Sequence, residues 1–405
     1  MSARPRLLVL ASTYPRWQDD PEPGFVHELS RRLTGRFEVA VLAPHAAGAK
    51  SEEIMGGVHV FRYRYAPARW ETLVNAGGIV NNLKRQPWRW LLVPGFLLAQ
   101  LWATRRLIRR WQPDVIHAHW LIPQGLLVAM LANMDRRVPP FVVTSHGADL
   151  FALRAAPLVV LKRFVIKHAA AITVVSKVMQ DEVLKLGADI ARASVQPMGV
   201  DMRTRFIPDS AVNRSTTEIL FVGRLVEKKG LARLIAVMPA VLSVCPDASL
   251  TVVGFGPEEA ALRLQVRQLG LQGKVDFVGA VPQSGLPGFY RRAALCVAPF
   301  VQAASGDQEG LGLVAVEAIA CGCPVLVGDV PAARDIPVDR VDVSDQTAFT
   351  AAITGILHDP DVARALAHDR RQSCFEKFDW EAVASGYAGV LDRQSMNNGN
   401  SGYRS

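Results

Sequence analysis

The sequence has few cysteines, and their spacing suits neither a disulfide framework nor a metal site. Only five occur in 405 residues, namely Cys245, Cys296, Cys321, Cys323 and Cys374. Their number is odd, and Cys321 and Cys323 are separated by one residue, whereas zinc ligand pairs are typically separated by two or more. This pattern argues against a disulfide-rich secreted fold and predicts reduced cysteines in the core of a cytoplasmic protein.

The sequence also lacks a long uninterrupted apolar run. The longest uncharged apolar stretch, residues 90–104, contains Pro94-Gly95 and is 15 residues long, fewer than the roughly 20 needed to span a bilayer. The apolar run near the N-terminus, Leu7 to Ala11, has five residues and is soon followed by a Tyr-Pro turn, which suits a first β-strand better than a signal peptide. We therefore expect neither a spanning helix nor export.

Charged residues make up only 20% of the chain, while hydrophobic residues make up 50%. A chain of this length and composition exceeds a single core, so two domains are expected. The net charge is +9, and it is uneven: residues 1–200 hold 26 Lys and Arg against 14 Asp and Glu. A basic half is typical of proteins that meet phosphate groups. Because no zinc finger or RNP motif is present, nucleic acid is not an expected partner.

Short β-branched runs alternate with longer amphipathic segments, which is the pattern of parallel α/β sheets. The pattern occurs twice, first in "RLLVLAS", "FEVAVLAP", "DVIHAH", "PFVVTSH" and "AITVVS", and then in "EILFVGR", "SLTVVG", "KVDFVG", "LCVAPF" and "CPVLVG". A change in charge and the loop-like "PMGVDMRTRFIPDSAVNRST" lie between the two sets. The sequence therefore predicts two Rossmann-like domains with a boundary near residue 200, and functional loops at the carboxyl ends of the strands.

The segment "EILFVGRLVEKKG" places Arg224 and Lys229 in a loop that opens a helix, beside Gly223 and Gly230. Helix N-termini attract anions through free N–H groups and the macrodipole, and two added cations suit a diphosphate. A solvated loop is the alternative. The segment "VVGFGPEEAALR" repeats the arrangement with Gly254 and Gly256, although one G-x-G is by itself more typical of a tight turn between strand and helix.

One carboxylate stands out in "GDQEGLGLVAVEAIACGCPVLVG". Glu317 is the only charged side chain between Gly310 and Pro324, and it is expected about two turns into a helix that follows Glu309. Burial of an unpaired carboxylate costs several kcal/mol or forces protonation. Glu317 therefore needs hydrogen-bond donors, which the vicinal hydroxyls of a ribose would supply. A buried salt bridge with an Arg or Lys elsewhere is the alternative.

These motifs together resemble a known family. The set "GRLVEKKG", "GFGP" and "EGLGLVAVEAIACGCPVLVGD", with "SHGADL" and "YPRWQDDPEPGFVHEL" upstream, is similar to the retaining Leloir glycosyltransferases of the GT-B fold, family four. The likeness runs from Arg6 to about Leu391. It implies an α/β fold of the GT-B type, in which two Rossmann-like domains face each other across a cleft.

The resemblance assigns roles to the residues of the second half. It implies that Arg224 and Lys229 neutralise the diphosphate of a sugar nucleotide, that Glu309 holds hydroxyls of the donor sugar, and that Glu317 binds the ribose. The full set of donor-binding residues implied is Gly24, Gly223, Arg224, Lys229, Gly254, Gly256, Glu309, Gly310, Leu311, Gly312, Leu313 and Glu317. No metal and no cofactor are expected, because the two cations would serve as the divalent ion does elsewhere.

In the first half the resemblance points to His146, which would lie near the reaction centre, although a strand-end histidine is more often an ordinary polar residue. His146, Glu309, Arg224 and Lys229 form the implied catalytic set. Asp149 and His119 are expected on the acceptor side. His117 and His119 share a strand face, which could suggest a metal pair, but a pocket or core position is favoured because no third ligand is near in sequence.

The chain departs from the family pattern at two places. It has Pro331-Ala332 where relatives commonly have Gly-Gly, and Met198-Gly199-Val200-Asp201 where they have Asn-Gly-Val-Asp. The first puts contacts of that loop with the donor or acceptor in question. Asp359-Pro360-Asp361 could be read as a metal motif, but a helix cap explains it better.

The expected organisation follows from these assignments. Residues 1–200 form an N-terminal acceptor-binding domain, 201–375 form a C-terminal nucleotide-sugar domain, 376–392 form a helix that crosses back, and 393–405 form a disordered tail. The expected reaction transfers a hexosyl group from a nucleoside-diphosphate sugar to a glycan or lipid-linked hydroxyl, with retention, in polysaccharide or glycolipid synthesis. The alternatives are an epimerase or phosphorylase on the same fold, or a non-catalytic subunit that binds sugar nucleotides.

A basic and aromatic segment suggests where the protein acts. Residues 84–111, "KRQPWRWLLVPGFLLAQLWATRRLIRRW", combine four tryptophans with seven Lys and Arg around an apolar middle. This combination suits the interface of an anionic bilayer, whereas the alternative is a long helix packed on the first sheet with its arginines in solvent. We expect a cytoplasmic protein that is peripheral on the inner face of the membrane.

Overall fold

The computed structural model describes residues 4–18, 20, 24–75 and 78–401. By its internal contacts the chain divides into two units, and each is described here by itself. Unit 1 comprises residues 1–175, 179–196 and 383–405, and unit 2 comprises residues 176–178 and 197–382.

Unit 1 is built on an eight-stranded sheet with the order β3-β4-β2-β1-β5-β6-β7-β8. Every neighbouring pair is parallel except β3 and β4. The strands are β1 (Arg6–Leu10), β2 (Glu38–Pro44), β3 (Glu52–Met55), β4 (Val58–Tyr63), β5 (Val115–His119), β6 (Phe141–Ser145), β7 (Ala171–Val174) and β8 (Ala193–Val195).

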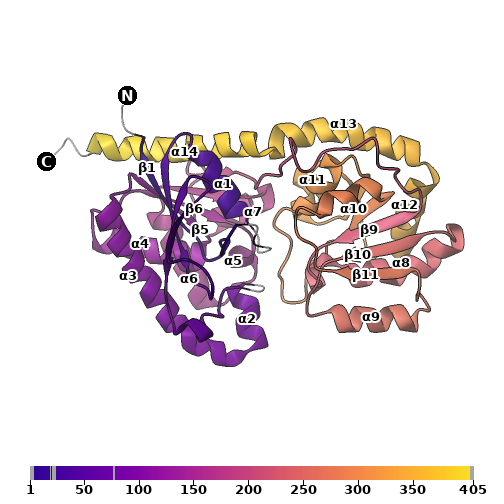
Figure 1. Ribbon diagram of the computed structural model, residues 1–405, viewed down its shortest axis with the longest axis horizontal. Helices are drawn as coiled ribbons and strands as arrows, with labels where there is room; N and C mark the ends of the chain where they lie inside the picture. Colours follow the sequence, from indigo (N-terminus) through magenta and orange to yellow (C-terminus); the bar gives the residue numbers. More distant parts are fainter. Residues whose placement is uncertain (1–3, 19, 21–23, 76–77, 402–405) are drawn as a thin grey trace. The chain divides into compact units, whose positions relative to one another are not determined.

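Helices connect these strands and cover the sheet of unit 1 (Figure 1). They are α1 (Phe25–Leu33), α2 (Ile79–Arg85), α3 (Val93–Trp111), α4 (Leu126–Met134), α5 (Ala148–Phe151), α6 (Ala156–His168) and α7 (Lys177–Lys185). Short helical segments of other types are η1 (Ala68–Trp70), η2 (Pro87–Leu92) and η3 (Leu121–Gly125). The strands β5 and β6 are buried along their whole length, as expected for parallel strands with helices on both faces.

Unit 2 contains a six-stranded parallel sheet with the order β11-β10-β9-β12-β13-β14. The strands are β9 (Glu218–Val222), β10 (Ser249–Val253), β11 (Val275–Gly279), β12 (Leu295–Ala298), β13 (Val325–Gly328) and β14 (Asp339–Val341). The helices are α8 (Leu231–Val244), α9 (Glu259–Gln268), α10 (Leu286–Arg292), α11 (Leu313–Ala320), α12 (Gln346–His358) and α13 (Pro360–Phe378), with short segments η4 (Glu227–Lys229) and η5 (Pro331–Asp335). Figure 1 shows helices on both sides of this sheet.

Each sheet has a position where the strand order reverses direction along the chain. The reversal lies between β1 and β5 in unit 1, and between β9 and β12 in unit 2. In open parallel sheets, ligands bind at the carboxyl ends of the strands at such positions. The loops that carry the predicted site residues follow these same strands or their neighbours.

The ten strands expected from the sequence are all present, and four more are found. The expectation missed β3, β4, β8 and β14. β3 and β4 form an antiparallel edge hairpin around Gly56-Gly57, while β8 and β14 have only three residues each. The short edge strands β3, β8 and β14 bury few side chains, so their hydrophobic pattern is weak, whereas β4 is an interior strand of six residues with four of them buried.

The C-terminal region departs from the expectation in two ways. The last helix, α14 (Trp380–Ser401), begins at Trp380 and not at residue 376, because the extended backbone of Asp379 separates it from α13. Asp379 accepts a hydrogen bond from the N–H of Glu381 at 3.1 Å and so caps the new helix. The prediction of a disordered tail is wrong for residues 393–401, which continue α14; residues 402–405 lie outside the described part of the chain.

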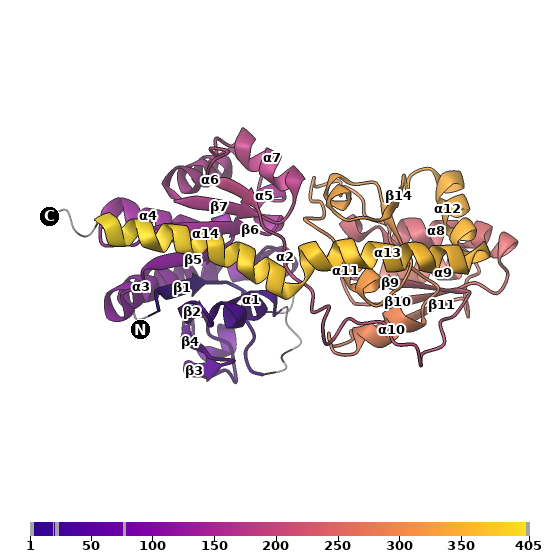
Figure 2. The same cartoon turned by 90° about the horizontal axis from the view of Figure 1, so that it is seen from above.

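The boundary between the units falls inside α14, whose residues from Val383 onward belong to unit 1. Figure 2 shows this helix running alongside β5 and β6. Tyr387 contacts the ring of His117 at a centroid distance of 5.5 Å and donates a hydrogen bond to the carbonyl of Gln196 at 2.8 Å. Leu391 is fully buried. Once these contacts fix the helix, each further residue adds a backbone hydrogen bond without a new nucleation step, which explains its extension into a polar sequence.

The segment Pro87–Trp111 is helical over 25 residues, longer than the uncharged stretch within it. By length and composition it is the one helix among the described residues that could cross a membrane, and a third of its most apolar window is buried. The core helix of a globular protein passes the same test. Here Phe96, Thr104 and Leu107 face inward, so one side of α3 is packed against unit 1.

Candidate functional site

The loop after β9 carries the two predicted cations of unit 2. Arg224 is exposed, whereas Lys229 ends η4 and is largely buried. Gly230 follows with φ +70°, and a Cβ atom there would lie 1.8 Å from the carbonyl oxygen of Pro299. Only glycine therefore allows η4 to pack against the end of β12. This close approach fixes the position from which the Lys229 side chain extends.

Lys229 and Glu309 form an ion pair, with 2.7 Å between Nζ and Oε2. Nζ also lies 4.9 Å from the centroid of the Phe300 ring. Burial opposes ionisation of Glu309, but Lys229, Lys228 and a hydrogen bond from the N–H of Gly310 outweigh it and lower its pKa to about 2. Apart from the Lys229 ammonium, Oε2 has no hydrogen-bond partner among the described residues. It can still accept a hydroxyl donor.

Glu317 is 8% exposed and lies on α11. The hydroxyl of Tyr290 donates a hydrogen bond to its Oε2 at 2.9 Å. Within the described residues no Lys or Arg lies within ion-pair distance, so the alternative of a buried salt bridge finds no support. Burial raises the pKa of Glu317 to about 7, against hydrogen bonds from Tyr290 and Gln283. These two donors leave part of the hydrogen-bonding capacity of the carboxylate unused.

The helix that carries Glu317 starts later than the sequence suggested. Gly312 has φ +81° and a Cβ atom at this position would lie 2.7 Å from the Phe300 ring. This left-handed residue sets the start of α11 at Leu313, so Glu317 lies about one turn into the helix and not two. The segment Gly310 to Leu313 leads into the start of α11, where backbone N–H groups have no intrahelical partners. The N–H of Gly310 donates a hydrogen bond to Glu309.

The glycines of the turn after β10 have a packing role. A Cβ atom on Gly254 would lie 1.9 Å from the carbonyl oxygen of Gly223, and one on Gly256 would lie 2.3 Å from that of Leu225. The loops after β9 and β10 thus touch through their backbones. Gly223 itself lies beside Lys229, whose Cδ would be 3.6 Å from an added Cβ atom. These glycines bring the two loops together whether or not they contact a ligand.

In unit 1 the predicted residues gather at the carboxyl ends of β5 and β6. Nδ1 of His119 lies 2.9 Å from Nε2 of His146, and the two rings stack at a centroid distance of 5.2 Å. Burial lowers the pKa of His146 to about 3 and that of His117 to about 3, and it holds the pKa of His119 well below the usual range. All three imidazoles are neutral at physiological pH.

His119 and Asp149 are buried and contact neighbouring residues of the cluster. His119 is fully buried against His146 in the ligand-free chain, and its expected place on the acceptor side stays a prediction. Asp149 is also buried, and its two oxygens accept hydrogen bonds from the N–H of Leu121 at 2.7 Å and the hydroxyl of Ser145 at 2.8 Å. It therefore ties the loop after β6 to the loop after β5. His117, 2.7 Å from the hydroxyl of Thr144, is a core residue.

Gly24 directly precedes α1, and its neighbour Phe25 packs against the ring of His146 at 4.9 Å. Trp120 packs on the same imidazole at 5.1 Å. A Cβ atom on Gly24 would meet only Pro15 at 3.7 Å, so sterics do not require glycine there. Pro23 lies outside the described residues. The structure thus brings Gly24 and His146 into one cluster.

Some contacts had no signal in the sequence. Tyr290 lies in a short helix among arginines, and nothing in its spacing indicated a partner for Glu317. Phe25 and Trp120 were not expected around His146, since aromatic residues beside a strand end usually belong to the core. Among residues 4–401 as described, no group of three His, Cys, Asp or Glu side chains is arranged to hold a metal ion.

The departures from the family pattern are accommodated locally. Pro331 begins η5 at a position where proline is favoured, and Ala332 is buried. Gly199 packs so closely on Trp380 that a Cβ atom would lie 2.4 Å from its ring. Asp359 accepts a hydrogen bond from the N–H of Val362 and Pro360 begins α13, which confirms the helix cap.

Two family models match the chain in succession. Glycosyltransferase Family 4 matches residues 25–204, and Glycosyl transferases group 1 matches residues 202–373. The first match ends and the second begins close to residue 200, where the sequence predicts the domain boundary. Together they cover most of unit 1 and nearly all of unit 2.

Individual relatives agree with this. The chain is 30% identical over 297 residues to the phosphatidyl-myo-inositol mannosyltransferase of Mycolicibacterium smegmatis, covering 70% of this chain and 73% of that one. It is 26% identical over 409 residues to the glycogen synthase of Mycobacterium tuberculosis, covering 95% and 94%. Among solved structures, the HepE protein of Anabaena in complex with UDP-glucose has the same fold, with a TM-score of 0.72, 16% identity, and coverage of 96% and 99%. By its motifs, its two Rossmann-like units and these matches, the chain belongs to the family-four glycosyltransferases of the GT-B fold.

Proposed function

We propose that the protein transfers a hexosyl group from a nucleoside-diphosphate sugar to a hydroxyl of a glycan or lipid-linked acceptor, with retention of the anomeric configuration. The observation that carries the proposal is Glu317. A carboxylate that is 8% exposed, with hydrogen bonds from Tyr290 and Gln283 but no ion pair among the described residues, and with a pKa raised to about 7 by burial, is unfavourable unless a ligand supplies further donors. The vicinal hydroxyls of a ribose supply two.

The Lys229–Glu309 pair supports the same donor. An incoming diphosphate would take the Lys229 ammonium as a charge-assisted partner, with Arg224 of the same loop as a second cation. Glu309 would then keep its low pKa through the remaining cations and accept hydroxyl groups of the sugar through Oε2. The complex of HepE with UDP-glucose and the names of the mannosyltransferase and glycogen synthase relatives favour a sugar nucleotide over other phosphorylated donors.

In the proposed reaction, the bond from the anomeric carbon to the diphosphate oxygen breaks and a bond to the acceptor oxygen forms on the same face. The acceptor proton passes to an oxygen of the departing diphosphate. The protein contributes position and charge: Lys229 and Arg224 stabilise the negative charge on the leaving group. His146, held neutral by burial, would offer a hydrogen bond and not a charge. These cations take the role of a divalent ion, so we propose a metal-independent enzyme.

We further propose that the protein works in the cytoplasm at the inner face of the membrane, in cell-surface polysaccharide or glycolipid synthesis. The exposed tryptophans and arginines of η2 and α3 support this location, as does the lipid-linked substrate named for the mannosyltransferase relative. An acceptor that is anchored in the membrane would reach the enzyme from that surface.

Calorimetry with free UDP and GDP tests the donor site directly. We expect one of the two nucleotides to bind the wild-type protein and Glu317→Gln to bind it at least tenfold more weakly, with a melting temperature no lower than that of the wild type. The amide keeps the shape and the hydrogen bond from Tyr290 but loses the charge. Equal affinity combined with a collapsed melting temperature would make Glu317 a structural residue and remove the basis of the proposal.

Product analysis against a panel of sugar nucleotides and acceptors then tests the reaction. Formation of a glycosylated product that depends on both substrates is expected. Consumption of free phosphate would indicate a phosphorylase, and turnover without an acceptor would indicate an epimerase. Binding without any product would indicate a silent binding subunit.

A further inference from the structure

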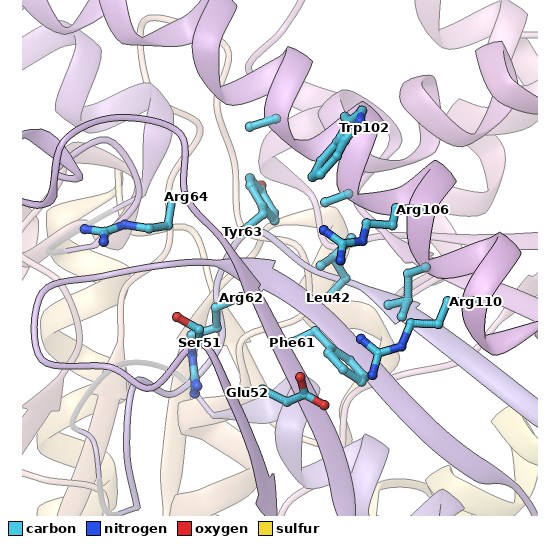
Figure 3. Close-up of a pocket in the computed structure, with 13 residues that line it drawn as sticks. Leu42, Ser51, Glu52, Phe61, Arg62, Tyr63, Arg64, Trp102, Arg106 and Arg110 are labelled. Atoms are coloured by element: carbon cyan, nitrogen blue, oxygen red, sulfur yellow. The ribbon is translucent and has the colours of Figure 1, made fainter.

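A hollow of about 390 Å³ lies in unit 1 between α3 and the strands β2 and β4. Its walls combine two kinds of side chain. Leu42, Phe61 and Leu107 are among its apolar lining residues. Figure 3 shows Leu42 and Phe61 with the arginines Arg106 and Arg110 beside them. The carboxyl end of β4, and not the cluster around His146, borders this space. No residue assigned to donor or acceptor binding lines it.

The arginines of the hollow differ in how they are used. Arg62 is buried and forms an ion pair with Glu53 at 2.6 Å, and Arg64 lies 3.5 Å from Glu71 and points away from the hollow in Figure 3. Arg106 and Arg110 are exposed, and neither has an ion-pair partner among the described residues. In Figure 3 both extend from α3. Two guanidinium groups one helical turn apart suit one phosphate group.

One acidic side chain also lines the hollow. Glu52, on the exposed start of β3, also lines the hollow and would repel an anion. It is opposed by Arg106 and Arg110, and no ion pair neutralises it within the described residues. The local balance therefore stays positive, so an anion is favoured over a cation.

The adjoining face of the helix is apolar and unusually exposed. Leu98 and Trp102 of α3 are 66% and 64% exposed and fall on one stripe because they are four residues apart, and Leu91 of the preceding η2 is 82% exposed. Trp102 borders the hollow, and the guanidinium of Arg106 lies 5.3 Å from its ring. A polar anionic group in the hollow would thus be continuous with an apolar chain along this stripe. That is the chemistry of an anionic phospholipid.

We propose that the hollow binds the headgroup phosphate of an anionic bilayer phospholipid through Arg106 and Arg110, with an acyl chain leaving across Trp102 and Leu98. The inference rests on the membrane location proposed above, but it adds a defined site. A surface that is merely basic would respond to total charge, whereas this site requires particular arginines. Arg105 and Arg109 lie on the same helix, are equally exposed and do not line the hollow.

The chain therefore offers a matched pair of variants. Arg106→Gln/Arg110→Gln and Arg105→Gln/Arg109→Gln remove the same charge from neighbouring faces of α3. Binding is measured by calorimetry with short-chain dihexanoyl phosphatidylglycerol below its critical micelle concentration. Under these conditions no charged bilayer surface is present to attract the protein. We expect one bound lipid in the wild type, at least a tenfold loss of affinity in the first variant, and less than a twofold change in the second. Equal losses in both variants would overturn the site.

Two controls identify the ligand. Dihexanoyl phosphatidylcholine should bind at least tenfold more weakly, and inorganic phosphate should not bind at the same concentration. Phosphate binding as tight as that of the lipid would overturn the assignment to a phospholipid. Sedimentation with phosphatidylglycerol vesicles tests the membrane location separately. If the wild-type protein does not bind the vesicles, both the membrane location and the phospholipid site are excluded. Nucleotide binding at Glu317 is tested independently by calorimetry.

Discussion

Glu309 and Glu317 show at the residue scale how position decides the properties of one functional group. They are eight residues apart, and both are largely enclosed by protein. The cations around Glu309 lower its pKa to about 2, whereas burial raises the pKa of Glu317 to about 7. At neutral pH, Glu309 is ionised and Glu317 is divided between its two forms. A ligand that donates hydrogen bonds to Glu317 would therefore favour the ionised form of this carboxyl group.

The raised pKa has a measurable effect on stability. A carboxyl group with a pKa near 4.5 in the unfolded chain and about 7 in the folded one binds more protons when folded between these values. Stability of the ligand-free protein should accordingly fall as the pH rises from about 4.5 to 7, by roughly 3 kcal/mol from this group. Glu317→Gln should lack this decline. Urea unfolding of both proteins at pH 5 and pH 8 measures the difference, and parallel curves would show that Glu317 is not perturbed.

Lys229 provides the second test at this scale. Lys229→Ala removes the proposed diphosphate contact and leaves Glu309 without its 2.7 Å partner. A charge-assisted hydrogen bond contributes about 1.5 to 3 kcal/mol, so transfer should fall about tenfold to a hundredfold. Arg224→Ala should behave similarly. Arg263→Ala, an exposed arginine of α9 paired with Glu259, is the control and should keep full activity. Wild-type turnover in Lys229→Ala would exclude it from the site.

At the scale of elements, the helix α14 contributes buried side chains to unit 1. Val383, Tyr387 and Leu391 are buried along one side of it, and Arg36 pairs with Asp392 at 3.0 Å. The helix begins in a segment assigned to unit 2 and continues in unit 1. Its apolar side completes the core of the first sheet.

Replacement of a buried leucine in this helix should destabilise unit 1. Leu391→Ala, at a fully buried position, should cost about 2 to 5 kcal/mol by loss of transfer energy and by cavity formation. Met396→Ala, on the exposed side of the same helix, should change stability by less than about 0.5 kcal/mol. Thermal unfolding of the two variants compares them. Similar melting temperatures would indicate that α14 does not contribute to the core.

The elements also show what the sequence could predict. Nine of the ten expected strands were recognisable because buried parallel strands are continuous apolar runs, whereas β11 is a partly exposed edge strand. The motif residues Arg224, Lys229, Glu309 and Glu317 could be assigned to one unit because they follow such strands. The partners of these residues could not: Tyr290 and Phe300 reach the site through packing of distant segments. The left-handed Gly312, which starts α11, likewise depends on contact with Phe300.

At the scale of the whole molecule, the expected acceptor and donor residues are distributed over the two units. The residues expected near the acceptor lie in unit 1, and those expected on the donor lie in unit 2, except Gly24, which lies in unit 1. Both sets lie on the loops and helices that follow the carboxyl ends of the strands, as the topology of parallel sheets requires. The domain organisation was readable from charge and periodicity, since each sheet repeats the same pattern. The start and extent of α14 were not, because they depend on the cap at Asp379 and on tertiary contacts.

The complete reaction is the test at this scale. Transfer should persist in EDTA, because Lys229 and Arg224 are proposed to stabilise the leaving group, and the product should keep the anomeric configuration of the donor. Proton NMR of the product, from the coupling constant of the anomeric proton, measures the second point. An absolute requirement for a divalent ion would contradict the proposed role of the cations, and an inverted product would contradict the same-face displacement.

The position of α14 in the chain has a consequence for biosynthesis. The eight strands of unit 1 are complete once residue 195 has left the ribosome, but the helix that runs alongside β5 and β6 is made only after unit 2 (Figure 2). Until then, an apolar face stays open while unit 2 is translated and folds. Nascent chains generally fold domain by domain from the N-terminus, and exposed apolar surface promotes aggregation. Chaperones should therefore hold the first unit until α14 has been made, and chains released before that point should be degraded.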